Sequence, residues 1–195
     1  MNDRSKHAAM KRYFKYADKS KPVFCYPKEN LSIEFYNQVY DVNCFTDGYS
    51  CVLTFDDIGD METYDEYCDK PYIDIQTLFN YLNGDYTRSC GRLVDVNSVI
   101  TKAKEAGYKF KKNEIMTSDK FKYIWKYHDR YYKIGILDQA FSIINTKDKC
   151  HVVCGPNGVL FIDNMYGMVA IMPYIWDKCN RKDEVIVIEL EESEE

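Results

Sequence analysis

The chain has 195 residues, of which 46% are hydrophobic and 29% are charged, and its formal net charge is −5. This length and balance predict a globular protein with one good-sized domain or two small ones. There is no run of about 18 apolar residues, which argues against a membrane-spanning helix, and the opening residues MNDRSKHAAMKRYF lack the apolar core of a signal peptide. We therefore expect a cytoplasmic protein with no membrane partner, whose eight cysteines are reduced thiols.

The first part of the sequence predicts one helix followed by antiparallel strands. Residues 5–17 place alanines and tyrosines on one side of a helix and basic residues around the others. LSIEFY alternates as a half-buried strand does, and QVYDVNCF and YSCVLTF predict two further strands. The turn Thr46–Gly48 joins the last two in a tight hairpin, in which Cys44 and Cys51 would lie roughly opposite each other as packed thiols.

The middle of the sequence predicts two units in which a short strand leads into a helix. The acidic stretch 56–71 predicts a loop, and the two units that follow it are YIDIQTLFNYLNG and LVDVNSVITKAKEAG. In the second unit, Asn97 or Ser98 is the expected N-cap of the helix and Gly107 is the expected C-cap. Residues 108–133 then alternate lysines with aromatic residues, which predicts solvent-facing strands and also suits contact with nucleic acid.

The last part of the sequence contains the clearest helix prediction, IGILDQAFSIINT. Its apolar residues form one stripe at helical spacing: Ile136, Leu137, Ala140, Phe141 and Ile144. KCHVVCG, VLFIDN and MVAIMPY predict three strands with turns between them, and Pro173 ends the last strand because it has no N–H to donate. VIVIEL predicts one more strand, at the edge of a sheet, followed by an acidic tail.

The residues that most often carry catalysis or bind metals do not fall into a recognisable pattern. His7, His128 and His151 have no partners at the spacing of a nucleophile or metal site, and the sequence contains no phosphate-binding glycine loop. Cys150 and Cys154 would face the same side of a strand about 13 Å apart, which is too far for one metal ion. We therefore predict a protein that is not an enzyme and that holds no metal and no cofactor.

The order of elements from Tyr132 onward resembles the closing half-domain of bacterial-type DNA sliding clamps, the β subunit of the replicative polymerase. The resemblance lies in a strand, a helix and three strands that end in AIMPY. The first half adds NCFTDGYSCVL, which resembles the strand and Thr-Asp-Gly turn of clamp half-domains. The resemblance covers residues 6–55 and 132–174. Single-domain chains that resemble one clamp domain are familiar among uncharacterised phage and mobile-element proteins.

The resemblance implies an α+β fold in which an antiparallel sheet is backed by helices. Two helix-plus-meander halves would form a single clamp-like domain over residues 1–180. Residues 56–131 would be a central insertion containing the two strand–helix units, and residues 181–195 would be the edge strand and the acidic tail. A bacterial clamp subunit has three such domains, whereas this chain has room for one.

Charge is segregated along the chain, and this segregation leads to two alternative binding hypotheses. Residues 1–28 carry eight basic residues against two acidic ones, and residues 101–133 carry ten against four. Residues 55–74 carry eight acidic residues against one lysine. Blocks of opposite charge favour opposite partners, because each attracts a surface of the other sign.

The first hypothesis is a non-catalytic phage or mobile-element binding protein with a sliding-clamp-like fold that associates with DNA or DNA-handling proteins. Helices 5–17 and 97–106 would present basic residues to phosphates without reading sequence. The predicted DNA-binding residues are Lys6, Lys11, Arg12, Lys15, Lys102 and Lys104.

The alternative hypothesis is an anti-defence inhibitor of the anti-CRISPR type, which blocks a nucleic-acid-guided nuclease of the host. Acidic residues would occupy a basic nucleic-acid channel, and tyrosines would anchor them there. The predicted partner-binding residues are Asp56, Asp57, Asp60, Glu62, Tyr64, Asp65, Glu66, Tyr67 and Tyr72. The two hypotheses place DNA and a nucleic-acid-binding host protein, respectively, on different parts of the chain.

Overall fold

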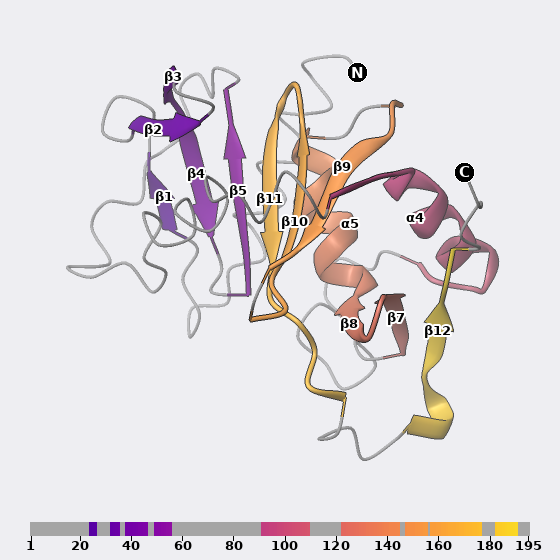
Figure 1. The fold of residues 1–195 in the computed structure, drawn as a ribbon. Coiled ribbons are helices and arrows are strands. Elements are labelled where there is room, and N and C mark those ends of the chain that lie inside the picture. The colour runs from indigo at the N-terminus through magenta and orange to yellow at the C-terminus, as the bar shows by residue number, and fades with distance from the viewer. Residues whose placement is uncertain are drawn as a thin grey trace.

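The structure is a computed structural model of the chain. It describes residues 24–26, 32–35, 38–46, 49–55, 91–109, 122–144, 147–155, 157–176 and 182–190. Within these residues, a seven-stranded sheet, a three-stranded sheet and a two-stranded sheet are combined with two α-helices (Figure 1). The predicted helix 5–17, the acidic stretch 56–71 and the strand–helix unit before Gly84 lie outside the described residues.

The seven-stranded sheet is antiparallel throughout and joins the two ends of the sequence. Its strands, in spatial order, are β1 (Phe24–Tyr26), β4 (Asn43–Thr46), β5 (Ser50–Thr54), β11 (Gly167–Ile171), β10 (Leu160–Asn164), β9 (Cys150–Cys154) and β6 (Arg92–Val94). The join is the pairing of β5 with β11, in which Val52 lies opposite Val169. Strands β9, β10 and β11 from the last part of the chain therefore share one sheet with β4 and β5 from the first part.

The predicted hairpin around Thr46 is confirmed by the pairing of β4 with β5. Cys44 lies opposite Leu53 and Thr46 lies opposite Cys51, so the two cysteines are diagonal neighbours on one face of the sheet. Their Sγ atoms are 3.4 Å apart, and both side chains are buried thiols that form no disulfide. The predicted packing of these two thiols is therefore confirmed.

The single strand predicted for QVYDVNCF is wrong, because the chain forms two strands there. β3 (Gln38–Asp41) pairs with β2 (Ser32–Phe35) as a separate two-stranded sheet, whereas β4 joins the large sheet. Val42, which lies between β3 and β4, is completely buried. The strand divides at this residue because its two parts pair with different partners.

The hairpin of β10 and β11 depends on the chemistry of its turn residues. The Asn164 side-chain oxygen accepts a hydrogen bond from the Tyr166 N–H (2.8 Å), and its amide nitrogen donates to the Ile144 carbonyl (2.7 Å). Gly167 has a φ of +156°, and a Cβ there would lie 2.0 Å from the Leu53 carbonyl oxygen. Only glycine fits here, because β5 approaches the backbone so closely.

The three-stranded sheet contains the strands β12 (Ile186–Ile188), β7 (Tyr123–Tyr127) and β8 (Arg130–Lys133), in that order. β7 and β8 form an antiparallel hairpin, and β12 pairs with β7 in parallel. The predicted edge position of β12 is confirmed. The predicted exposure of the other two strands is wrong, because Trp125 is 1% exposed and Tyr132 is completely buried.

Helix α5 (Ile134–Ile144) explains this burial, because it lies between the two sheets and contacts β5 and β11 on one side and β7 and β8 on the other. The predicted helix is confirmed over Ile134–Ile144, and its last two predicted residues lie outside the described residues. Seven of its residues are buried, which are Ile134, Leu137, Gln139, Ala140, Phe141, Ile143 and Ile144. Each fully buried aliphatic or aromatic side chain contributes roughly 1.5–3 kcal/mol relative to exposure. The main hydrophobic core therefore forms around this helix.

Helix α4 (Val96–Glu105) follows β6 and packs beside α5. Its N-cap is Asp95, not Asn97 or Ser98: the Asp95 carboxylate accepts hydrogen bonds from the Ser98 N–H (3.1 Å) and the Ser98 hydroxyl (2.6 Å). The C-cap is Ala106, and Gly107 follows with a φ of +97°. Glycine adopts this left-handed conformation without the strain that a Cβ would cause.

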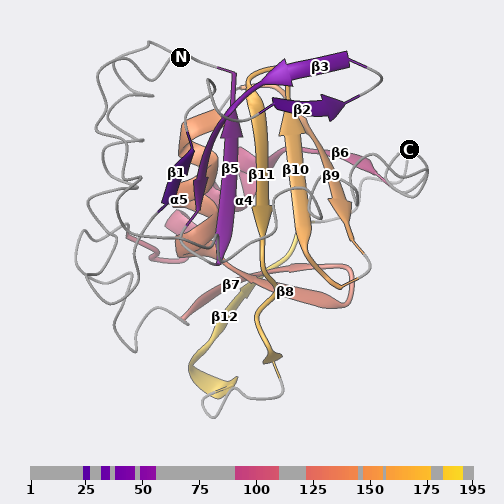
Figure 2. The same ribbon diagram turned by 90° about the vertical axis from the view of Figure 1, so that its left-hand side faces the viewer.

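The two helices lie on one face of the seven-stranded sheet (Figure 2). The α+β class and the antiparallel sheet backed by helices are therefore confirmed. The opposite face of the sheet carries a second buried cluster, formed by Val42, Cys44, Cys51, Leu53, Val153, Phe161, Met168 and Ala170. No helix in the described part of the chain is long and apolar enough to cross a membrane.

Candidate aromatic and lysine surface

The chain crosses from the large sheet to the small sheet directly after β11. The Met172 N–H donates to the Tyr49 carbonyl oxygen (2.9 Å), and the Tyr174 N–H donates to the Tyr131 carbonyl oxygen (2.7 Å). Pro173 lies between these two residues and has no N–H, so the pairing of the large sheet ends there. The Met-Pro-Tyr sequence thus connects the start of β5 to β8.

This crossing brings two aromatic rings face to face. The rings of Tyr131 and Trp176 are stacked, with centroids 4.5 Å apart and planes at 14°. Successive side chains of a strand point to opposite faces, so Tyr131 and Lys133 lie on the face of β8 opposite Tyr132. Tyr132 is buried in the core, so the side chains of Tyr131 and Lys133 lie on the outer side of β8.

Lysines lie against these rings at both ends. The Lys133 Nζ is 5.2 Å from the ring centroid of Tyr174 and 5.8 Å from that of Tyr49. The Lys182 Nζ, on a short 3₁₀ helix (Lys182–Glu184), is 5.6 Å from the ring centroid of Trp176. These distances fall within the range of cation–π attraction. We call this set the aromatic–lysine surface: Tyr49, Tyr131, Lys133, Tyr174, Trp176 and Lys182.

The aromatic–lysine surface is open to solvent and partly apolar. Tyr49 is 43% exposed, and Met172 and Ile175, on the same crossing segment, are 46% and 56% exposed. Tyr131, Tyr174 and Trp176 are half-buried. Flat ring faces beside mobile ammonium groups can stack on bases and neutralise phosphates, which is the combination that single-stranded nucleic acid requires.

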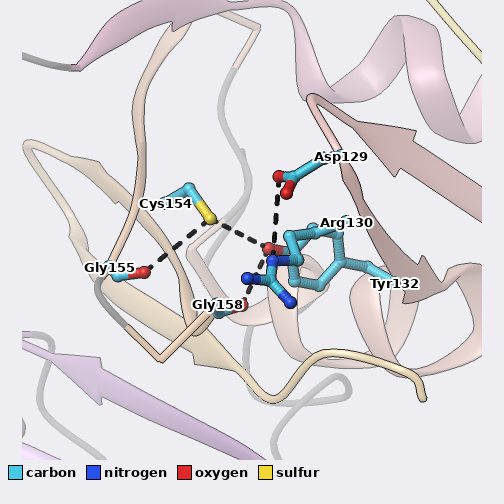
Figure 3. Close-up of polar contacts among 6 residues, drawn as sticks. All are labelled: Asp129, Arg130, Tyr132, Cys154, Gly155 and Gly158. Atoms are coloured by element: carbon cyan, nitrogen blue, oxygen red, sulfur yellow. Dashed lines mark hydrogen bonds and ion pairs between the residues drawn. The ribbon is translucent and has the colours of Figure 1, made fainter.

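On the core side of β8, the Tyr132 side chain points toward Cys154 and Gly158 (Figure 3). The Tyr132 hydroxyl donates to the Gly158 carbonyl oxygen (2.8 Å) and lies 3.4 Å from the Cys154 Sγ. Burial raises the pKa of Tyr132 well above its ordinary value, and the Cys154 thiol raises it further. The phenol therefore stays protonated at neutral pH and acts as a fixed donor that ties β8 to the turn between β9 and β10.

The turn of the β7–β8 hairpin lies next to this anchor. Asp129 and Arg130, which are consecutive residues, form an ion pair there, with 3.7 Å between Oδ1 and Nε. His128 in the same turn has a φ of 52°, a left-handed conformation that non-glycine residues adopt mainly in turns. Both members of the ion pair are largely exposed, so the pair contributes little to stability.

A second polar pair, His151 and Asp163, lies on the large sheet. The two residues are direct cross-strand partners, and the His151 Nδ1 is 3.3 Å from the Asp163 Oδ1. Burial raises the pKa of Asp163, and the histidine opposes that rise. Sequence spacing did not reveal this partner of His151, because only the register of β9 against β10 brings the two residues together.

Of the residues predicted to bind DNA, the structure describes Lys102 and Lys104, which are exposed on α4. The Lys102 Nζ donates to the Glu189 carbonyl oxygen (3.4 Å). The other four, Lys6, Lys11, Arg12 and Lys15, lie outside the described residues, as do all nine acidic and tyrosine residues of the inhibitor hypothesis. Within the described part of the chain, His, Cys, Asp and Glu residues form no group of three that could hold a metal ion.

None of the individual residues predicted to bind DNA or a partner belongs to the aromatic–lysine surface. The stretch 108–133, whose mix of lysines and rings suits contact with nucleic acid, contains Tyr131 and Lys133. It did not include Tyr174, Trp176 or Lys182. The signal in the sequence for these residues was Pro173. A proline ends the pairing of a strand, so the residues that follow it can pair with a different segment.

Comparison with protein-family models, with curated proteins and with solved structures gave no match to this chain. Function is therefore inferred from the residues and their geometry.

Proposed function

We propose that this protein is a non-catalytic binding protein that associates with nucleic acid and holds single-stranded segments on the aromatic–lysine surface. The observation that carries the proposal is the stack of Tyr131 on Trp176, with Lys133 and Lys182 against neighbouring rings. Stacking of a base on an aromatic side chain contributes about 1–3 kcal/mol, and lysines add attraction to the phosphates. The proposal includes the cytoplasmic location expected from the sequence.

The identity of the cations favours nucleic acid over a protein partner. Protein–protein interfaces are enriched in Tyr, Trp and Arg but depleted in Lys. Among the residues that the structure describes, the cations placed over the rings of this surface are Lys133 and Lys182. A lysine ammonium suits phosphate, to which it binds as a point charge.

The proposal places nucleic acid on a different surface from the one that a sliding clamp uses. In the clamp hypothesis, the helices that back the sheet face the duplex. None of the residues of α5 is exposed, because the small sheet covers the side of the helix that the large sheet leaves open. The two-half clamp architecture, and the phage or mobile-element origin that it implies, remain hypotheses about ancestry.

One observation favours a protein partner as the second candidate function. Met172 and Ile175 are exposed beside the rings, and Met, Tyr and Trp are enriched in protein interfaces. The inhibitor hypothesis would then use this surface together with the acidic residues of the segment 55–74. Such a protein would bind its nuclease target and would leave free oligonucleotides unbound.

The test is the binding of a fluorescently labelled 20-nucleotide oligo-dT, followed by anisotropy at about 50 mM salt, where phosphate contacts are strong. Trp176→Ala should weaken binding by roughly 5- to 150-fold, the equivalent of about 1–3 kcal/mol. Tryptophan fluorescence should also be quenched on binding in the wild-type protein.

The matched control is Phe55→Ala. Phe55 is also a partly exposed aromatic residue (39%), but it follows β5 at the end opposite Tyr49. The Phe55→Ala variant should bind the oligonucleotide with the same affinity as the wild type. Equal affinities of Trp176→Ala and the wild type, or an absence of binding by the wild type, would show that the proposal is wrong.

A further inference from the structure

The aromatic–lysine surface continues across the three-stranded sheet to an ion pair. Lys126 of β7 is the direct cross-strand partner of Tyr131, and such partners have Cβ atoms about 4.5–5.5 Å apart on one face. The Lys126 Nζ lies 2.8 Å from the Glu189 Oε1. One row of side chains therefore runs from Trp176 through Tyr131 and Lys126 to Glu189.

The backbone of Glu189 is held on both sides. Glu189 directly follows β12, which pairs in parallel with β7 and places Ile188 opposite Trp125. Ile188 is 6% exposed and belongs to the main core. The Lys102 Nζ of α4 donates to the Glu189 carbonyl oxygen (3.4 Å). The carboxylate at the end of the row is therefore carried on a supported backbone.

The ion pair of Lys126 and Glu189 is accessible to a ligand. The two side chains are 37% and 58% exposed, and exposed ion pairs contribute little to stability. An ammonium group has three N–H donors and a carboxylate has two acceptor oxygens, so one mutual contact leaves capacity on both. The hydrogen bond to Glu189 raises the pKa of Lys126, so the lysine stays charged at neutral pH. The pair thus offers a donor and an acceptor side by side, next to the rings.

Glu189 distinguishes this row from a surface that binds only phosphates. A carboxylate repels the backbone of nucleic acid, but it accepts hydrogen bonds from the N–H groups of bases. Proteins read the Watson–Crick edges of unpaired bases by such hydrogen bonds while the bases stack on aromatic rings. On this edge, guanine alone among the common bases has two adjacent donors, N1–H and N2–H₂, and its O6 beside them is an acceptor. The two donors match the carboxylate, and O6 matches the ammonium group.

We propose that the aromatic–lysine surface prefers guanine among unpaired bases. Glu189 accepts hydrogen bonds from N1–H and N2–H₂, and Lys126 donates to O6. The base stacks on the rings of Tyr131 and Trp176 with its Watson–Crick edge toward the ion pair. This inference deepens the proposed function and rests on it, because the base must stack on the rings before its edge can be read.

The test compares two labelled single-stranded oligonucleotides of equal length and charge. One alternates thymine with guanine, and the other alternates thymine with hypoxanthine, which is guanine without its N2 amino group. Alternation avoids runs of guanine, which associate with one another. The wild-type protein should bind the guanine oligonucleotide roughly 2- to 12-fold more tightly in anisotropy titrations, the equivalent of about 0.5–1.5 kcal/mol for one net hydrogen bond.

Two variants that each remove one negative charge decide whether Glu189 reads the base. Glu189→Gln replaces one acceptor oxygen with a donor nitrogen, so the ratio of the two affinities should fall to about one. Glu105→Gln changes an exposed glutamate of α4 and should keep the wild-type ratio. Because each ratio is measured on a single variant, the general effect of charge cancels. Thermal unfolding of both variants checks that the fold is intact.

The guanine preference is overturned if the wild-type protein binds both oligonucleotides equally, if Glu189→Gln keeps the preference, or if Glu105→Gln loses it as well. Weaker binding of oligo-dT by Trp176→Ala would still support base stacking in each of these cases. An absence of binding to any oligonucleotide would overturn both proposals. Failure of the inference can therefore be distinguished from failure of the proposed function.

Discussion

Tyr131 and Tyr132 are neighbours in β8, yet they lie on opposite faces of the strand and in different surroundings. Tyr132 is completely buried and donates a hydrogen bond to Gly158. Tyr131 is half-buried and stacks on Trp176 at the surface. The same side chain thus serves as part of the core on one face and as part of a candidate binding surface on the other. We therefore expect substitutions of Tyr132 to affect mainly stability and substitutions of Tyr131 to affect mainly binding.

The largest expected difference between the two faces is in stability. Tyr132→Ala removes a fully buried ring and leaves the Gly158 carbonyl without its donor, so it should lower the free energy of unfolding by about 3–5 kcal/mol. Tyr131→Ala removes mainly one ring contact and should cost about 0.5–1.5 kcal/mol. Urea denaturation measures both values. A loss of similar size in the two variants would contradict the assignment of β8 faces.

The stability that Tyr132 contributes should also depend on pH. Because the folded-state pKa of Tyr132 is raised, the phenol keeps its proton when the unfolded chain begins to lose one at about pH 10. Its contribution to stability is fully present below this pH and falls as the pH rises, with a slope of about 1.4 kcal/mol per pH unit for one proton. Tyr132→Phe should remove that slope.

Denaturation midpoints between pH 9 and 11 provide the measurement for this second prediction. Buried Tyr108 carries a raised pKa as well, for the same reason and because of Asp138. Part of the alkaline loss should therefore remain in Tyr132→Phe, and the informative quantity is the difference from the wild type. Identical pH dependence of the two proteins would argue that Tyr132 is exposed to solvent.

Helix α5 and the hairpin of β4 and β5 were predictable from the sequence, because local periodicity and turn chemistry determine them. The apolar spacing from Ile136 to Ile144 predicted α5, and the Asp-Gly turn predicted the hairpin of β4 and β5. The sequence predicted Asn97 or Ser98 as the N-cap, whereas the N-cap is Asp95. The three residues are all good capping residues and lie within four positions of one another. Such errors shift a boundary and leave the element in place.

The burial of β7 and the contacts at the surface were less predictable, because pairings between distant segments determine them. Trp125 belongs to an alternating pattern that suits an exposed strand, and only the position of α5 beneath the hairpin buries it. Tyr131 meets Trp176 because the Tyr174 N–H pairs with β8. Glu189 meets Lys126 because β12 pairs in parallel with β7. No local pattern in a single sequence specifies these registers.

The smallest predicted effect concerns Lys133, which shares the surface face of β8 with Tyr131. Its ammonium group lies over two rings, Tyr49 and Tyr174, and remains half-exposed. If it also neutralises one phosphate of a bound single strand, Lys133→Gln should lower the slope of log K against log salt by about 0.7. The affinity for oligo-dT should fall only a few-fold at moderate salt, because the stacking rings remain. Lys149→Gln, which changes an exposed lysine before β9, is the matched control and should leave the slope unchanged. A reduced affinity with an unchanged slope would instead mean that Lys133 acts by holding the rings in position, and that phosphates are bound elsewhere.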